Sequence, residues 1–247
     1  MSMNTQTTAF AATVEKILTS PDDLLAPVGV TNGEPLVIDL RRNPNVLLAG
    51  FAGSGKSTLL RLIAGALELQ VGRDGSVVFT EGIGVGVDEA ITEVHDELLR
   101  RQRERTPNEK RGPVVLCVDD FGVWSEHSPS PESLAMLRRI ALTARGHDVH
   151  LVLATQSATG IGTDLLTAMS TRIVLGRVGT EYRRLLSELE WPGVVEAADH
   201  IGSGALGEGV LVDAEGQPTV FAPLDPTGES FAAAAATVRL RRTRNAR

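Results

Sequence analysis

The 247-residue sequence contains a single cysteine, Cys117. It also lacks an apolar run long enough for a membrane-spanning helix, which needs about 18 residues. Cys117 lies inside the apolar run 114–118, so we expect it to be a small buried residue that forms no disulfide. The first residues, MSMNTQTTAF, lack the charged and apolar parts of a signal peptide. These absences favour a cytoplasmic protein without a membrane segment of its own.

Basic residues are fewer than acidic residues, with 24 Lys and Arg against 31 Asp and Glu, which gives a net charge of −7. This balance argues against a surface that binds nucleic acid everywhere. Five arginines nevertheless fall within residues 239–247, so the end of the chain is a basic appendage on an acidic body. Two interpretations stay open for it: a solvated tail, or a contact with nucleic acid or an acidic protein.

Apolar strands alternate with amphipathic helices along most of the chain, which is typical of an α/β fold with a largely parallel sheet flanked by helices. Continuous apolar strands such as 114–118 are those that a parallel sheet buries on both faces. A Gly-rich stretch with a turn at 214–216 predicts a C-terminal β-hairpin. The expected strands are 36–40, 46–49, 77–80, 114–118, 149–154 and 172–175, and the expected helices are 57–69, 88–105, 133–143 and 162–168.

The pattern divides the chain into three parts. Residues 1–27 combine a weak helical pattern with a Ser-Pro break, which predicts an N-terminal arm. Residues 28–225 form the expected main domain, with its core beginning near Pro35, and residues 226–247 form an Ala-rich and Arg-rich tail.

Residues 50–57 read GFAGSGKS and match the P-loop pattern in full. An apolar strand precedes them and a helix follows, so the backbone N–H groups of the loop converge where a phosphate can bind. Lys56 is expected to reach the β and γ oxygens, and the Ser57 hydroxyl to ligate Mg²⁺. The expected nucleotide contacts are Gly50, Ala52, Gly53, Ser54, Gly55, Lys56, Ser57 and Thr58.

Two carboxylates, Asp119 and Asp120, follow the apolar strand 114–118. Such a strand carries them to the edge of the sheet where ligands bind in open α/β folds. We expect Asp119 to bind the metal and Asp120 to orient or deprotonate the attacking water. Because no Asn-Lys-x-Asp guanine-reading motif occurs, ATP is favoured over GTP.

The strand 149–154 ends in Thr155 and Gln156. A polar side chain there can donate a hydrogen bond to the γ-phosphate or the water and so report the bound nucleotide. An ordinary polar pair that caps the strand is the alternative. His150 is expected to be a core residue rather than a metal ligand, because no other ligand side chain repeats at metal-binding spacing.

Several stretches resemble the FtsK/SpoIIIE group of P-loop motor ATPases within the HerA–FtsK superfamily. The most specific is Ala144-Arg145 followed by VHLVLATQ at 149–156. The approach to the P-loop (33–50), the helix 88–101 and the later segments 171–174 and 206–211 are similar as well. The resemblance covers residues 22–223 and implies a RecA-like P-loop NTPase core.

The resemblance implies an ATP-hydrolysing motor that moves double-stranded DNA through a homo-oligomeric ring, with a hexamer as the expected form. It also implies that Arg145 reaches the γ-phosphate of the neighbouring subunit. Family members commonly have Glu at the position of Asp120, and often Arg-Pro where this chain has Ser157-Ala158. The chain has no length for membrane helices or a DNA-reading winged helix, so we expect a minimal motor core.

Two other functions stay open at this point. The ATPase domains of type VII secretion have similar approach sequences and often Asp-Asp at the second acidic position, so a motor for protein substrates with a membrane or secretion partner is one alternative. A switch in which the nucleotide only sets assembly is the other.

Overall fold

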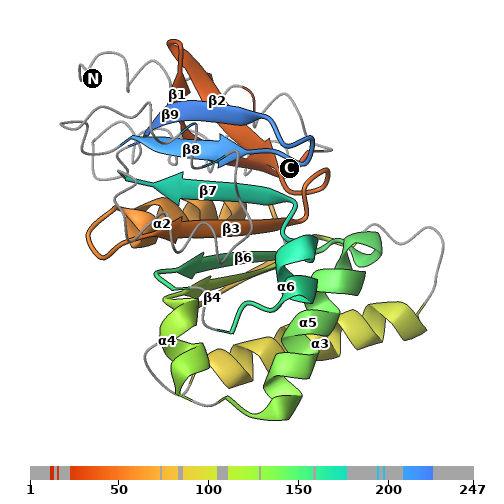
Figure 1. The fold of residues 1–247 in the computed structure, drawn as a ribbon. Coiled ribbons are helices and arrows are strands. Elements are labelled where there is room, and N and C mark those ends of the chain that lie inside the picture. Colours follow the sequence, from red (N-terminus) through yellow and green to blue (C-terminus); the bar gives the residue numbers. More distant parts are fainter. Residues whose placement is uncertain are drawn as a thin grey trace, which may run out of the picture.

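The computed structural model describes residues 23–72, 74–82, 86–104, 111–127, 129–157, 160–176 and 208–224, together with 12, 13, 16, 194 and 197. Within these residues, the strands form a nine-stranded sheet in the order β2-β1-β9-β8-β7-β3-β6-β5-β4, with helices on both faces (Figure 1). None of the described helices is both long and apolar enough to cross a membrane.

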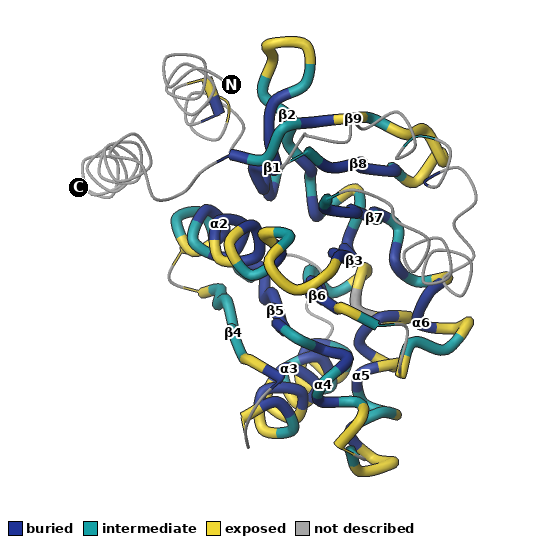
Figure 2. The backbone as a smooth tube through the Cα atoms, turned by 60° about the vertical axis from the view of Figure 1, so that its left-hand side comes forward, coloured by how far each residue is buried: buried dark blue, intermediate teal, exposed yellow. Residues whose placement is uncertain are grey.

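Parallel strands make up one half of the sheet. These strands are β3 (Asn45–Gly50), β4 (Ser76–Glu81), β5 (Val114–Asp119), β6 (Val149–Thr155) and β7 (Thr171–Leu175). Every residue of β3, β5 and β6 is buried, as expected for strands that are covered on both faces (Figure 2). We call the edge where the parallel strands end the carboxyl edge, and the edge where they begin the amino edge.

Antiparallel strands make up the other half, namely β8 (Gly209–Val212), β9 (Pro218–Pro223), β1 (Leu25–Thr31) and β2 (Glu34–Asp39). Strands β8 and β9 form the predicted C-terminal hairpin, and Gly216 takes a left-handed backbone conformation in its turn (φ 79°). The α/β fold with helices flanking the sheet and a C-terminal hairpin is therefore confirmed, and the sheet is mixed, with parallel strands in one half and antiparallel strands in the other.

The sheet begins earlier than the sequence indicates. The core was expected near Pro35, but β1 already starts at Leu25 and pairs with both β2 and β9, so the boundary predicted at residue 28 falls within this strand. Pro27 and Gly29 are unusual inside strands and hide the pattern. A Cβ on Gly29 would lie 2.3 Å from the backbone oxygen of Ala222, so the close approach of β9 requires glycine there. The tail 226–247 and most of the arm 1–27 lie outside the described residues.

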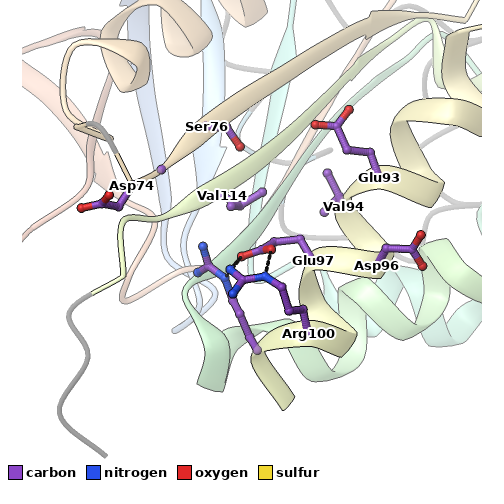
Figure 3. A pocket seen from close by; sticks show the side chains of 10 residues that line it. Asp74, Ser76, Glu93, Val94, Asp96, Glu97, Arg100 and Val114 are labelled. Atoms are coloured by element: carbon purple, nitrogen blue, oxygen red, sulfur yellow. Dashed lines mark hydrogen bonds and ion pairs between the residues drawn. The ribbon is translucent and has the colours of Figure 1, made fainter. Parts of the chain in front are cut away.

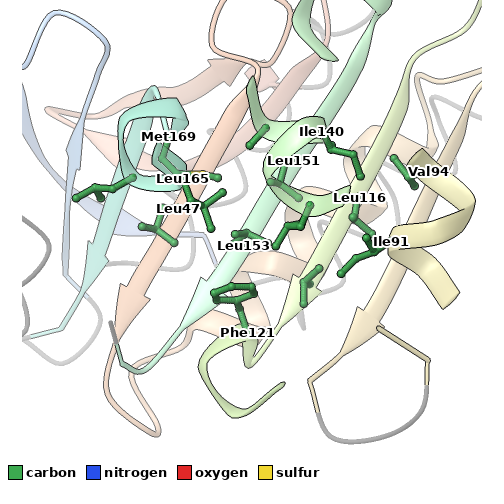
Figure 4. Packing of buried hydrophobic residues seen from close by; sticks show 14 of the residues in the cluster. Leu47, Ile91, Val94, Leu116, Phe121, Ile140, Leu151, Leu153, Leu165 and Met169 are labelled. Carbon is green, nitrogen blue, oxygen red and sulfur yellow. The ribbon is translucent and has the colours of Figure 1, made fainter. Parts of the chain in front are cut away.

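The helices form two layers around the sheet. Helix α2 (Lys56–Glu68) covers one face, and α3 (Gly86–Arg103), α5 (Pro131–Thr143) and α6 (Thr163–Ala168) cover the other. The alternation along β3 sets the layers, because Leu47 packs in the α3–α5–α6 layer and Leu48 in the α2 layer. Figure 4 shows Leu47, Leu151 and Leu116 of adjacent strands facing α5, α6 and α3.

Two residues that the sequence assigned to the core are found there. Cys117 is a free, fully buried cysteine, and burial raises the pKa of its thiol to about 12, so the thiol stays protonated. His150 is 1% exposed on β6, with its Nε2 3.0 Å from Asp148 Oδ1. The core positions predicted for Cys117 and His150 are therefore confirmed.

A hollow of about 490 Å³ lies beside the amino edge, between α3 and the starts of β4 and β5 (Figure 3). Hydrogen bonds from Arg100 and Arg101 on its wall hold the pKa of Glu97 at about 2, although burial opposes the effect. Arg101 is buried and also donates to the backbone oxygens of His147 and Gly112. These contacts anchor α3 to the amino edge, and none of the predicted site residues lines this hollow.

Candidate nucleotide site

The P-loop joins the end of β3 at Gly50 to the start of α2 at Lys56, on the carboxyl edge. Gly53 and Gly55 have φ angles of 76° and 95°, which strain any residue with a side chain. The Ser54 N–H donates to the Phe51 carbonyl oxygen at 3.1 Å and closes the turn. The strand, turn and helix therefore occur where the sequence predicts them.

The start of α2 suits an anion. Its N-cap is Gly55, which offers no side chain to the first-turn N–H groups, and no acidic residue lies in that turn. The Ser54 hydroxyl oxygen is buried and has no hydrogen-bond partner among the described residues. Thr58 and Ala52 are exposed beside it, and Ser57 is half-buried. These features fit a bound phosphate group.

Lys56 is only 4% exposed, and its Nζ donates to the Phe51 carbonyl oxygen at 2.8 Å. Burial lowers the pKa of this ammonium group, while the charges of Asp120 and Asp119 act in the opposite direction. The three side chains thus form one electrostatic cluster. A buried ammonium group is stabilised by further negative charge, which phosphate oxygens would supply.

The acid pair, Asp119 and Asp120, lies where β5 ends. Asp119 is 3% exposed, and its Oδ1 accepts the Asp120 N–H at 3.0 Å. Asp120 has a left-handed backbone (φ 47°) and is the N-cap of α4 (Phe121–Glu126). Asp and Asn enter this region more easily than other residues with side chains. The backbone therefore favours Asp over Glu at this position.

The end of β4 supports the acid pair from the side. The Gly82 N–H donates to the Asp119 carbonyl oxygen at 2.7 Å, which continues the pairing of Glu81 with Asp119. A Cβ on Gly82 would lie 2.2 Å from the Asp120 carbonyl oxygen. Because these are backbone atoms, a side chain at residue 82 could fit only if the acid pair moved.

Gln156 follows β6, the strand between β5 and β3, and its Nε2 donates to Asp120 Oδ1 at 2.8 Å. The Thr155 hydroxyl donates to the Ser157 carbonyl oxygen and accepts the Ser157 N–H, so a tight turn holds Gln156 in place. The structure thus brings the acid pair and Gln156 to the same edge as Lys56 and the P-loop.

Arg145 lies apart from this group. It is exposed in the 3₁₀ turn η1 (Ala144–His147), at the amino edge just before β6. The seven residues of β6 separate the two edges by about 20 Å, which is more than an arginine side chain can span. Arg145 therefore cannot reach the P-loop of its own chain.

Sequence reasoning missed α4 and the close approach of Gly82 to the acid pair. Helix α4 has only six residues, too few for a helical period to stand out. Its Trp124 Nε1 lies 3.4 Å from Asp88 Oδ2, so α4 also joins the acid pair to the start of α3. The Gly-Val-Trp sequence after the acid pair gives no signal for these contacts.

No cluster of three or more His, Cys, Asp or Glu side chains among the described residues is placed to hold a metal ion by itself. A Mg²⁺ ion between Ser57 and Asp119 would take the rest of its ligands from phosphate oxygens and water. This is how Mg²⁺ commonly binds in nucleotide sites.

Exchanging the two carboxylates for amides should separate their roles. Asp120→Asn keeps a residue that suits φ 47°, so we expect wild-type ATP affinity and a turnover that falls by about 10²- to 10⁴-fold, the contribution of a general base. Asp119→Asn should weaken Mg²⁺-dependent ATP binding itself. Nucleotide titrations with and without Mg²⁺, beside turnover, test this, and Asp164→Asn is the matched control because Asp164 is 55% exposed on α6. Identical behaviour of the two variants would refute the division of roles.

Known proteins match the chain in sequence over one segment and in fold over most of its length. The model of the FtsK/SpoIIIE family matches residues 11–70, which include the P-loop. No curated protein matches in sequence.

Among the solved structures that share the fold are a secretion ATPase and a conjugation coupling protein. The cytoplasmic domain of the Thermomonospora curvata type VII secretion ATPase EccC is 21% identical with a TM-score of 0.66. The match covers 87% of this chain and 31% of the solved EccC chain, so this chain spans about a third of the length of that cytoplasmic domain. The pCW3 conjugation coupling protein TcpA, solved with ATPγS, is 17% identical with a TM-score of 0.67, over 89% of this chain and 70% of TcpA. This chain is therefore similar to the FtsK/SpoIIIE family over the segment that contains the P-loop, and it shares its fold with EccC and TcpA.

Proposed function

We propose that the chain hydrolyses Mg²⁺-ATP at the carboxyl edge and uses the hydrolysis to move double-stranded DNA through a homo-oligomeric ring, with a hexamer as the expected form. The observation that carries the proposal is the gathering of Lys56, the acid pair and Gln156 at one edge, with the Asp120–Gln156 hydrogen bond at 2.8 Å. A cation, a metal-binding carboxylate and a second carboxylate next to a phosphate loop are the parts that phosphoryl transfer needs.

Each of these residues has a task in the proposed reaction. Ser57 and Asp119 would hold Mg²⁺, which when bound neutralises charge on the β and γ phosphates. Lys56 adds a positive charge against the same oxygens. Asp120 accepts a hydrogen bond from the attacking water and takes its proton as the water oxygen bonds to the γ-phosphorus, while the bond from that phosphorus to the bridging oxygen breaks and ADP leaves. Gln156 keeps the Asp120 carboxylate turned toward that water through its hydrogen bond.

The ring is proposed because Arg145 cannot reach the P-loop of its own chain. Any positive charge that Arg145 adds to a nucleotide site must therefore be added to the site of another subunit. Arg145 is exposed at the edge opposite the P-loop, so it is available to another subunit. In the proposed ring it lies against the γ-phosphate of the neighbouring chain and stabilises the charge that builds up as the bond breaks. ATP hydrolysis would then require assembly.

The cargo is the least constrained part of the proposal. Double-stranded DNA is favoured by the family resemblance, and the five arginines of residues 239–247 offer phosphate contacts on an otherwise acidic chain. A protein cargo is the alternative, because the fold is shared with EccC, whose ATPases 2 and 3 have been solved in complex with a signal sequence peptide (18% identity, TM-score 0.62).

An ATPase assay with two cargo arms distinguishes the candidates. We expect linear duplex DNA to raise the turnover of the full chain several-fold and a secretion-type signal peptide to leave it unchanged. Stimulation by the peptide alone would replace DNA with a protein cargo. Tight ATP binding without turnover in either arm would replace the motor with a nucleotide-dependent switch. Lys56→Ala protein, purified in parallel, serves as the blank for contaminating ATPases.

A further inference from the structure

Helix α4 packs unusually close to the turn that carries Gln156. A Cβ built on Gly122, the second residue of α4, would lie 2.6 Å from Ser157 Oγ and 3.0 Å from Thr155 Oγ1. Carbon and oxygen atoms that are not bonded to each other do not approach to 2.6 Å. A side chain at residue 122 would therefore require the Ser157 side chain to rotate or the turn 155–157 to move away. We call this contact between α4 and the turn 155–157 the α4 contact.

The backbone does not require glycine at residue 122. Gly122 is helical and is not among the glycines with positive φ. In a helix interior, glycine is about 1 kcal/mol less favourable than alanine. The space taken by the facing turn, and not the conformation of α4, is what disfavours a side chain here.

A second close approach lies further along the same helix. Gly160, in the chain that leaves β6, would place a Cβ 2.4 Å from the Ser125 Cβ of α4. Two positions on α4, one turn apart, thus lie against the segment that follows β6. The spacing between α4 and this segment is fixed at both ends of the contact.

This spacing bears directly on the acid pair. Asp120 is the N-cap of α4, and Gln156 is the middle residue of the turn that Gly122 touches. The Asp120–Gln156 hydrogen bond of 2.8 Å joins the two elements at the level of the α4 contact. A shift of the turn by 1 Å would lengthen this bond beyond the range of a hydrogen bond.

We propose that Gly122 is a positioning residue, which keeps the Gln156 turn close enough to α4 for Gln156 to hold the Asp120 carboxylate. The inference rests on the proposed function, because it concerns the hydrolysis step of that site. The side chains that a Cβ at residue 122 would meet are those of Thr155 and Ser157, the residues on either side of Gln156, so in this proposal Gly122 acts through Gln156.

Gly122→Ala tests the proposal. Because the added methyl group crowds the facing turn, we expect a folded protein with an unfolding temperature somewhat below that of the wild type. The P-loop is untouched, so ATP affinity should stay at the wild-type value, while kcat falls by about ten- to a hundredfold, as misplacements of about 1 Å do. Gly146→Ala is the matched control, because a Cβ at Gly146 meets no atom within 4 Å, and it should keep the wild-type kcat.

Two further variants show whether the effect passes through Gln156. The double variant Gly122→Ala/Gln156→Ala should have the kcat of Gln156→Ala alone. Ser157→Ala in the Gly122→Ala background removes the closest atom and should recover part of kcat, measured against Ser157→Ala by itself. Losses that multiply in the double variant, or a folded Gly122→Ala protein with wild-type kcat, would overturn the proposal.

Crystal structures of the same proteins give a readout that needs no activity. The distance from Asp120 Oδ1 to Gln156 Nε2 should stay within hydrogen-bonding range in the wild type and Gly146→Ala and exceed about 3.5 Å in Gly122→Ala. An unchanged distance would refute the positioning role. A wild-type chain without ATP turnover would instead refute the proposed function, while the distance still decides the role of Gly122. If Gly122→Ala fails to fold, Ser157→Thr crowds the same contact from the turn side and should act in the same direction.

Discussion

Purified Lys56→Ala protein is expected to lose ATP turnover to the level of a blank and to bind ATP roughly ten- to a hundredfold more weakly. The buried ammonium group is the positive charge of the P-loop, and a hydrogen bond to a charged group contributes about 1.5–3 kcal/mol. Turnover suffers more than affinity because the negative charge on the phosphate oxygens is greatest as the bond breaks. Isothermal titration with an ATP analogue and a phosphate-release assay measure the two effects separately.

Arg61→Ala is the matched control for this variant. Arg61 is a cation of the same helix α2, but it is exposed and paired with Glu81 at 3.0 Å, so its removal should change neither affinity nor turnover measurably. Thermal unfolding of both variants shows whether the fold is kept. Wild-type turnover by a folded Lys56→Ala protein would refute the assignment of the nucleotide site.

The second large effect is expected for Arg145→Ala, which should bind ATP like the wild type but lose turnover by about 10³-fold or more. The structure places Arg145 at the amino edge, so the loss would be that of a group supplied by another subunit. Arg139→Ala is the control, because Arg139 lies on α5, the helix before the turn that carries Arg145. Its guanidinium donates a hydrogen bond to the Gln102 side chain of α3 at 3.0 Å. Its turnover should stay at the wild-type level.

Mixing variants tests the shared site directly. An Arg145→Ala subunit offers an intact P-loop, and a Lys56→Ala subunit offers an intact Arg145, so mixed assemblies should contain some complete sites and regain part of the turnover. Size-exclusion chromatography with light scattering verifies that the two proteins assemble together. Mixtures that demonstrably co-assemble and stay inactive would count against a site built from two chains.

The parts of the site that are local in sequence could be predicted. The P-loop needs only a strand, glycines with left-handed backbones and a helix in succession, and the sequence pattern of residues 46–60 predicts all three. Asp119 and Gln156 each follow an apolar strand, and the rule that parallel strands end at one edge is enough to bring them together. The sequence alone therefore locates the candidate site at the carboxyl edge of the sheet.

The parts that depend on close approach between distant segments could not be predicted. β1 contains Pro27 and Gly29, which argue against a strand until β9 is seen to pass within 2.3 Å of the place where a Cβ would be. The same holds for Gly82 and Gly122, whose neighbours lie more than thirty positions further along the chain. The left-handed backbone of Asp120 is likewise set by the start of α4 and explains an aspartate that the resemblance alone leaves as a departure.

The most direct test of the account is phosphate release by the purified wild-type chain with Mg²⁺-ATP over a range of protein concentrations. A site completed by Arg145 of a neighbour predicts turnover whose specific rate rises with concentration, and hence more than linear growth, until assembly is complete. Turnover that is strictly proportional to protein concentration would contradict the shared site. Saturating ATP binding without phosphate release at any concentration would contradict ATP hydrolysis itself.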